Sequence, residues 1–185
     1  MYHPKGLYFH FILDKETCDK FEDSLNDKNF ANEKLDDGNR RNCKISWLSP
    51  EKNEYIYDVF WHYIQTYNII CNWNFDLQFL ESIQYTKYDK DDFYDWHIDT
   101  IKTDESTTRK LSVSFLLNEN FEGGEFQLET ELPSPDGIEK IRYETIPMRR
   151  GSFVLFHSGL PHRVTPVTSG VRKSLVAWAD GPPFK

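Results

Sequence analysis

The sequence is poor in cysteine and contains no long apolar run. Its 185 residues include three cysteines, Cys18, Cys43 and Cys71, which are widely spaced and form no Cys-x-x-Cys pair. An odd, sparse set of this kind argues against a disulfide framework and favours reduced thiols in a cytosolic setting. No segment approaches the length needed to cross a bilayer, and the first residues lack the cleavage-site pattern of a signal peptide. We therefore expect a cytoplasmic protein that makes no membrane contact.

Positive charge is also scarce. The 22 lysines and arginines are outnumbered by 30 acidic residues, which gives a formal net charge of -8. This balance disfavours binding to nucleic acid, because such binding uses Lys and Arg to displace counterions from phosphate. Charged residues make up 28% of the chain and aromatic residues 16%, a composition typical of a folded protein. At this length we expect a single domain over residues 1–185.

Residues 1–76 predict a strand and two supporting helices. The strand covers Gly6–Leu13, and a first helix follows with Asp14 as its N-cap and with Cys18, Phe21 and Leu25 at helical spacing. Residues 26–42 are polar and are expected to form a loop. A short strand over 43–48 then precedes a second helix that starts at Ser49-Pro50. Its apolar face is formed by Tyr55, Ile56, Val59, Phe60, Tyr63, Ile64 and Tyr67.

From Leu77 onward the hydrophobic period changes from helical to two, which is typical of strands. Turn residues such as Gly123-Gly124, Pro133–Gly137 and Ser169-Gly170 separate the segments. Many short strands without intervening helices predict a mainly β fold with flanking helices (α+β), in which residues 77–180 form a double-stranded β-helix, a cupin-like jelly roll. The expected strands after Tyr85 are Arg109–Leu117, Gly124–Thr130, Glu139–Ile146, Ser152–Phe156, His162–Val167 and Val171–Ala179.

His97 and Asp99 form the first candidate for a metal site. Successive side chains of a strand alternate between its faces, so these two point the same way while Ile98 points to the other. His157 and His162 are both candidates for a third ligand. Two histidines and one carboxylate on one side of a metal leave three positions open, as in non-haem Fe(II) oxygenases.

Arg172 is the candidate for binding an anion. It shares one face of the expected last strand with Ser174, Val176 and Trp178. An arginine facing the interior of a barrel is costly unless an anion meets it, and its planar fork suits a carboxylate. The alternative is an arginine on the outer face, paired with an exposed Asp or Glu.

Several ordered motifs together resemble the Fe(II)/2-oxoglutarate-dependent dioxygenases, and within them the prolyl 4-hydroxylase-like branch that includes the PKHD-type hydroxylases. The resemblance covers roughly residues 77–180, and its motifs are Gln84-Tyr-Thr-Lys-Tyr88, Tyr94-Asp-Trp-His97-Ile-Asp99, Gly123-Gly-Glu125 and His162-Arg-Val-Thr-Pro-Val-Thr-Ser-Gly-Val-Arg172-Lys-Ser-Leu175. Such a combination is far more specific than His-x-Asp alone.

The resemblance implies a role for each of these residues. His97, Asp99 and His162 would hold Fe(II), and Arg172 and Tyr88 would bind the distal carboxylate of 2-oxoglutarate. Trp178 would line the co-substrate pocket, and Tyr94 would lie near the metal on the substrate side. His157 falls where relatives commonly carry proline, so we interpret it as a supporting residue. The spacing from His162 to Arg172 favours His162 as the third ligand.

The implied reaction is hydroxylation of an unactivated C–H bond, coupled to conversion of 2-oxoglutarate and O2 to succinate and CO2, with ascorbate as a candidate reductant. A prolyl residue of a peptide or protein is the favoured target, and a free amino acid or other small molecule is the alternative. The segments expected at the mouth of the site are Arg40–Trp47, with Arg40 and Arg41 as substrate-side candidates, Thr100–Arg109 and Pro133–Gly137.

Two functions of other classes are also compatible with the ligand set. One is a non-catalytic, cupin-like metal-binding module, which would release no succinate. The other is a Zn2+-dependent hydrolase or isomerase, which would leave Arg172 and Tyr88 without a carboxylate to bind. Fold alone does not select the substrate.

Overall fold

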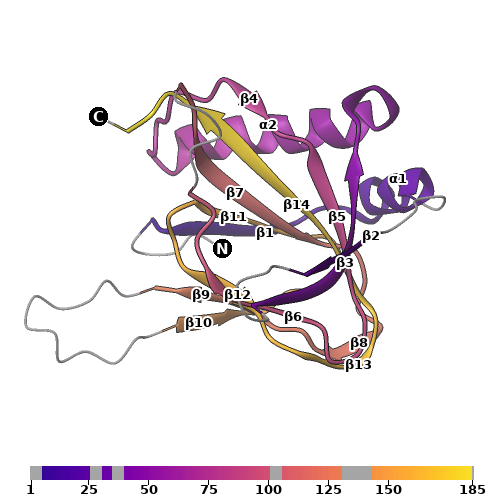
Figure 1. Ribbon diagram of the computed structural model, residues 1–185. Helices are drawn as coiled ribbons and strands as arrows, with labels where there is room; N and C mark the ends of the chain where they lie inside the picture. Colours follow the sequence, from indigo (N-terminus) through magenta and orange to yellow (C-terminus); the bar gives the residue numbers. More distant parts are fainter. Residues whose placement is uncertain (1–5, 26–30, 35–39, 101–105, 131–142, 185) are drawn as a thin grey trace, which may run out of the picture.

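A curled antiparallel sheet of twelve strands forms the body of the protein (Figure 1). The computed structural model describes residues 6–25, 31–34 (backbone only), 40–100, 106–130 and 143–184. The sheet runs in the order β1 (Tyr8–Ile12), β11 (Ser152–His157), β7 (Thr108–Leu116), β14 (Arg172–Gly181), β5 (Ile83–Tyr88), β3 (Arg41–Leu48), β6 (Phe93–His97), β12 (His162–Val164), β9 (Phe126–Glu129) and β10 (Tyr143–Ile146). Outside this order, β2 (Ala31–Lys34) pairs with β3 and β4 (Phe79–Leu80) with β14, and β8 (Phe121–Gly123) forms a separate pair with β13 (Val167–Gly170).

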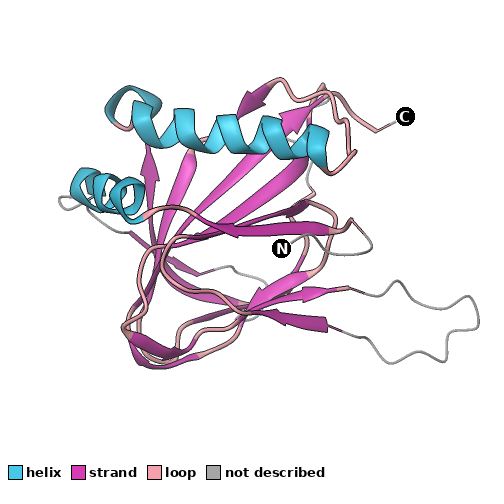
Figure 2. Ribbon diagram, turned by 180° about the vertical axis from the view of Figure 1, so that it is seen from behind, coloured by secondary structure: helices cyan, strands magenta, loops and turns pink. Residues whose placement is uncertain are grey.

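The sheet folds over into two facing layers. Figures 1 and 2 show the helices lying over the larger layer, which contains β1, β11, β7, β14 and β5, while β6, β12, β9 and β10 form the smaller layer on the other side. This arrangement confirms the predicted mainly β jelly roll with flanking helices. Neither of the described helices is long and apolar enough to cross a membrane.

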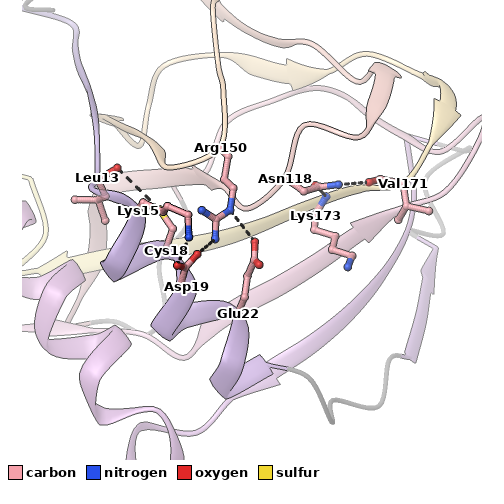
Figure 3. A network of polar contacts seen from close by, with 9 residues as sticks. All are labelled: Leu13, Lys15, Cys18, Asp19, Glu22, Asn118, Arg150, Val171 and Lys173. Atoms are coloured by element: carbon pink, nitrogen blue, oxygen red, sulfur yellow. Dashed lines mark hydrogen bonds and ion pairs between the residues drawn. The ribbon is translucent and has the colours of Figure 1, made fainter.

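Helix α1 (Lys15–Leu25) begins as the sequence predicts. The Thr17 N–H donates to Asp14 Oδ1 at 2.9 Å, which caps the helix, and Cys18, Phe21 and Leu25 are buried. Figure 3 shows how the helix is attached to the turn before β11: the Arg150 guanidinium donates to Glu22 at 3.0 Å and to Asp19 at 2.8 Å.

Helix α2 (Glu54–Ile70) begins later than predicted. Ser49 makes no side-chain cap bond, and Pro50–Lys52 form a short 3-10 turn instead. The Asn53 side-chain amide donates to the Ser49 carbonyl at 2.8 Å, which fixes the bend before the helix. Ile56, Phe60 and Ile64 then pack into the core as expected.

The predicted loop over residues 26–42 is wrong in two places. Residues 31–34 form β2, which pairs with β3, and β3 starts at Arg41 rather than at residue 43. The expected strand His162–Val167 divides into β12 and β13, so Ser169-Gly170 belongs to a strand and not to a turn. Pro133–Gly137, residues 101–105 of the expected mouth loop and residues 139–142 lie outside the described residues.

Strand alternation separates two cores. On β11, Phe153 and Leu155 pack toward the helices, whereas Val154 and Phe156 belong to a second cluster inside the barrel. On β14, Leu175 and Ala177 face the helices. The residues that alternate with these two on β14 therefore face the interior of the barrel. The functional side chains converge in this interior.

Candidate metal centre and its cavity

His97, Asp99 and His162 meet at one point between β6 and β12. His97 and His162 are paired residues on the two strands, and Asp99 follows two residues after the end of β6. Asp99 Oδ1 lies 3.7 Å from His97 Nε2, and its Oδ2 lies 3.4 Å from His162 Nε2. The three ligand atoms all lie within 4.8 Å of one another. Ile98, between His97 and Asp99, is 52% exposed and also lies at the edge of the cavity described below.

Both imidazoles are oriented by backbone carbonyls. His97 Nδ1 lies 2.7 Å from the Asp95 oxygen, and His162 Nδ1 lies 2.9 Å from the Leu160 oxygen. A carbonyl oxygen only accepts, so in both rings Nδ1 must carry the proton and Nε2 the lone pair. Each Nε2 therefore faces the cluster as a potential metal ligand, held by the outer hydrogen bond that is typical of metal-binding histidines.

The electrostatics also suit a cation. Burial lowers the pKa of His97 to about 3, and the neighbouring His162 adds to the effect, so His97 is neutral at physiological pH. Burial by itself would raise the pKa of Asp99, but the two histidines bring it below its usual range. Asp99 Oδ2 is buried and has no hydrogen-bond partner among the described residues. A cation between the three side chains would meet this carboxylate, so the residues fit a metal.

The cluster opens into a cavity of about 350 Å³ inside the barrel. Arg172 lies in its wall, is 1% exposed and donates from Nη1 to Ser174 Oγ at 3.0 Å. Its Nε and Nη2 are buried, with no partner in the described part of the chain. The alternative of an outward arginine with an acidic partner is therefore wrong. Two unsatisfied N–H groups in a closed space fit a carboxylate ligand.

The other co-substrate candidates line the same cavity. Tyr88 is the cross-strand partner of Arg172, and its ring centre lies 5.5 Å from the guanidinium carbon. Trp178 lines the cavity and is 6% exposed, and its indole Nε1 is buried without a partner among the described residues. Gly124 lies against this wall: a Cβ there would come within 3.0 Å of Arg172 Cδ.

The substrate-side candidates separate into two positions. Tyr94 lines the cavity and lies flat on the His97 ring, with centroids 3.5 Å apart and planes 13° apart. Arg41 also lines the cavity, with its guanidinium carbon 4.7 Å from the centre of the Tyr94 ring. It is a buried strand residue, 7% exposed, and not the loop residue expected. Arg40 is exposed and donates to the Trp96 carbonyl at 2.9 Å, outside the cavity lining.

His157 lies on the other face of the sheet. It follows Phe153 and Leu155 on the helix-facing side of β11, and its ring stacks on Phe184 with centroids 5.8 Å apart. Its Nδ1 accepts the Gly159 N–H at 3.0 Å. The structure therefore places His162, and not His157, beside His97 and Asp99.

The sequence placed Arg109 and Trp47 only at the ends of expected mouth segments and gave no role to Glu81, yet these three residues form contacts beside Trp178. Arg109 forms two hydrogen bonds to the Glu81 carboxylate, at 2.6 and 2.7 Å, and its guanidinium carbon lies 4.1 Å from the centre of the Trp178 ring. Trp47 also lies beside Trp178, with ring centroids 6.1 Å apart. The position of Trp47 follows from strand alternation, because it shares a face with Arg41 on β3. The Glu81–Arg109 pair joins distant strands and had no signal in the sequence.

Comparison with known proteins gives a consistent picture. Residues 83–180 match the family model of the 2OG-Fe(II) oxygenase superfamily. A PKHD-type hydroxylase from Hyphomonas neptunium is 36% identical over 92 residues, which cover 47% of this chain and 37% of that protein. The chain spans about two fifths of the length of the curated relatives it matches.

Solved structures share the whole architecture. A Pseudomonas putida prolyl-4-hydroxylase superposes with a TM-score of 0.69 at 20% identity, covering 93% of this chain and 91% of that one. A Trichoplax adhaerens prolyl hydroxylase, in complex with a peptide fragment of the hypoxia-inducible factor oxygen degradation domain, superposes with a TM-score of 0.70 at 20% identity, covering 94% and 83%. At these identities the likeness establishes the fold alone.

Proposed function

The chain belongs to the 2OG-Fe(II) oxygenase superfamily, and from this membership we propose that it is an Fe(II)- and 2-oxoglutarate-dependent dioxygenase that hydroxylates a prolyl residue of a peptide or protein. One observation carries the proposal. A three-residue metal cluster and a buried arginine with two unsatisfied N–H groups line the same cavity. A hydrolytic zinc site would not require the buried arginine with unsatisfied N–H groups.

His97, Asp99 and His162 are the proposed iron ligands. Both imidazoles are fixed in the tautomer that exposes Nε2, and the buried carboxylate supplies the negative charge. Three protein ligands leave room for the co-substrate and dioxygen. When bound, the iron supplies the oxidising chemistry that converts 2-oxoglutarate and O2 to succinate and CO2 and hydroxylates the substrate.

Arg172 and Tyr88 are the proposed residues for the distal carboxylate of 2-oxoglutarate. Arg172 has Nε and Nη2 available, and a guanidinium fork matches the two oxygens of a carboxylate. Burial raises the pKa of Tyr88 above its ordinary value, so its hydroxyl stays neutral and can donate. Trp178 and the apolar side chains of the inner strands would exclude water from the co-substrate.

A peptidyl target is supported by similarity. The relative from Hyphomonas is a PKHD-type hydroxylase, and the structural neighbours include prolyl hydroxylases, one of them with a bound peptide. Tyr94 and Arg41 would contact the substrate from the wall beside His97. The single-domain organisation and the cytoplasmic location remain predictions from the sequence.

The test is a turnover screen with purified protein, Fe(II), 2-oxoglutarate and a library of proline-bearing peptides in air. Succinate and hydroxylated peptide are measured separately, and Asp99→Ala is the control. We expect succinate and product in a one-to-one ratio with at least one peptide set. Release of succinate without peptide product would support a small-molecule substrate. No succinate under any condition would overturn the oxygenase and leave the metal-binding module or the Zn2+-dependent enzyme.

A further inference from the structure

An arginine packed beside two neighbouring aromatic rings lies on the outer face of the smaller layer. The Arg163 guanidinium carbon lies 4.8 Å from the centre of the Trp96 ring and 5.5 Å from that of the Tyr143 ring. The two rings are themselves 5.7 Å apart. We call this group of three residues the arginine clamp. Tyr143 is 50% exposed, and Trp96 and Arg163 are partly buried, so the clamp is open to solvent.

The clamp is directly linked to the candidate metal centre. Trp96 precedes His97 on β6, and Arg163 follows His162 on β12. The two histidines line the cavity, whereas Trp96 and Arg163 are absent from its lining and contact each other on the opposite face. Tyr94 also lines the cavity, because the strand pairing shifts its register between Tyr94 and His97. The same pair of strands therefore carries the metal cluster on one face and the clamp on the other. In both ribbon views the described helices lie over the larger layer, away from this surface (Figures 1 and 2).

The guanidinium is held in one orientation. Its Nε donates to Gln127 Oε1 at 2.7 Å, and Gln127 is 4% exposed. The Gln127 amide nitrogen is in turn held by Glu125 and Thr145, each at 3.1 Å. Within the described residues, no acceptor is hydrogen-bonded to either terminal nitrogen of Arg163. The clamp thus presents a fixed pair of N–H-bearing nitrogens toward solvent, in the fork geometry that binds carboxylates.

The acidic groups nearby leave this fork available. Asp95 Oδ1 accepts the Trp96 N–H at 2.8 Å, and Glu125 contacts Gln127. Glu129 lies two residues after Gln127 on the same strand face and is paired with Tyr143 across the strands. No ion pair joins Glu129 to Arg163 in the described part of the chain. A carboxylate from another molecule could therefore occupy the fork, with Glu129 as a mild repulsive neighbour.

We propose that the arginine clamp is an exosite that binds an acidic side chain of the peptide substrate, outside the catalytic cavity. This inference rests on the proposed function, because only an extended substrate such as a peptide can reach both the cavity and the clamp, which lie on opposite faces of β6 and β12. A chain that enters the cavity and turns over the ends of β6 and β12 would need roughly four to six extended residues, at about 3.3 Å each. The exosite would thus select substrates with Asp or Glu at that separation from the hydroxylated residue.

The experiment uses matched peptides that contain one proline and differ only in having Glu or Gln four, five or six residues to either side. The peptide KM is measured from the hydroxylated product. We expect the wild-type protein to favour the Glu peptide by about threefold to tenfold, a modest value because the site is partly exposed. Arg163→Gln should remove the preference, and Arg163→Lys should keep only part of it. Raising the salt concentration should weaken it.

Two matched variants test whether the effect is local. Lys90→Gln removes an exposed positive charge elsewhere and should keep the preference for Glu. Glu129→Gln removes the repulsive neighbour and should increase it. Equal KM values for Glu and Gln peptides in the wild type, or a preference that survives Arg163→Gln in a folded variant, would overturn the exosite while peptide hydroxylation stands.

If the wild type hydroxylates no peptide, the proposed substrate class is wrong rather than the clamp. The same peptides, fluorescently labelled, then report on the clamp by anisotropy. Tighter binding of Glu than Gln peptides that is lost in Arg163→Gln would support the clamp as an anion site. Equal binding of both peptides by the wild type would overturn it.

Discussion

Arg172 and Tyr88 are directly opposite each other on β14 and β5, and the guanidinium carbon of Arg172 lies 5.5 Å from the centre of the Tyr88 ring. Both side chains are almost completely buried. Burial lowers the pKa of Arg172 and raises that of Tyr88, so the charge of the guanidinium is costly in this position. An anion bound beside the guanidinium would offset the cost of burying its charge. Arg172 is therefore the first residue to test.

Arg172→Lys should weaken binding of 2-oxoglutarate even though the charge is kept, because an ammonium group does not reproduce a bidentate fork. A loss of about 1.5–3 kcal/mol, or roughly 10- to 150-fold, would match removal of a charged hydrogen bond. The measurement is the KM for 2-oxoglutarate in succinate release. Lys173→Gln is the matched control, because Lys173 is the neighbour that faces out of the barrel. An unchanged KM in Arg172→Lys would contradict the assignment.

His97→Ala, Asp99→Ala and His162→Ala should each abolish iron retention and turnover, because each removes one of three converging ligands. His157→Ala should keep most of both, since this ring lies on the helix-facing side and stacks on Phe184. Metal content after dialysis against Fe(II) or Mn(II) gives a readout that does not depend on a substrate. Loss of metal in His157→Ala with retention in His162→Ala would reverse the choice of the third ligand.

Arg41→Ala and Arg40→Ala should differ in their ratio of hydroxylated product to succinate. Arg41 is buried and covers the Tyr94 ring, so its loss should disturb the substrate side of the cavity. We expect the ratio of hydroxylated product to succinate to fall by about threefold to tenfold in Arg41→Ala, as misplacement of a C–H bond predicts. Arg40→Ala removes an exposed hydrogen bond to the Trp96 carbonyl, outside the cavity lining, and should keep the ratio near wild type.

The two products need separate assays for this comparison, together with a thermal melt of each variant. Equal losses of succinate and product in Arg41→Ala would show that Arg41 supports the fold or the metal cluster and not the substrate. An altered ratio in Arg40→Ala alone would place substrate recognition outside the cavity wall.

His157 should make the stability of the protein depend on pH. Burial lowers its pKa below the ordinary value of 6.5, and Lys110 contributes to the shift. The unfolded state therefore binds this proton at higher pH than the folded state does, and the free energy of unfolding should fall as pH drops below about 6.5. The slope from one such group is at most about 1.4 kcal/mol per pH unit.

Urea melts of metal-free protein between pH 5 and 8 measure this slope. His157→Gln should flatten the decline below pH 6.5, and His62→Gln, on the exposed side of α2, controls for loss of an imidazole. Parallel pH profiles of wild type and His157→Gln would show that His157 does not carry this dependence.

Alternating patterns made the inner face of β14 predictable. The period of two placed Arg172, Ser174, Val176 and Trp178 on one face, and all four line the cavity. The same rule predicted that His97 and Asp99 point together. These predictions succeeded because one face of each strand is buried, so the pairing register is strongly specified.

The region around Arg41 was not predictable in this way. Residues 31–34 have a polar sequence, and they become a strand because β3 offers them a partner. Strand propensity depends on such a partner more than on the residue itself. Arg41 was consequently assigned to a loop, although it is the first residue of β3, whereas Trp47 fell within the strand predicted over residues 43–48. Cross-strand pairs such as Glu81 with Arg109 need the folded topology before they exist.

The pairing of His162 with His97 links metal binding to the local stability of the smaller layer. β12 meets β6 through two residue pairs with a register shift between them, so this seam of the smaller layer has little backbone support of its own. A metal bound by His97, Asp99 and His162 would cross-link the seam and suppress its local opening. Backbone amides of β6 and β12 should therefore exchange with deuterium more slowly after addition of Mn(II), and less so in Asp99→Ala. Metal occupancy would then be measurable from the protein backbone, before any substrate has been identified.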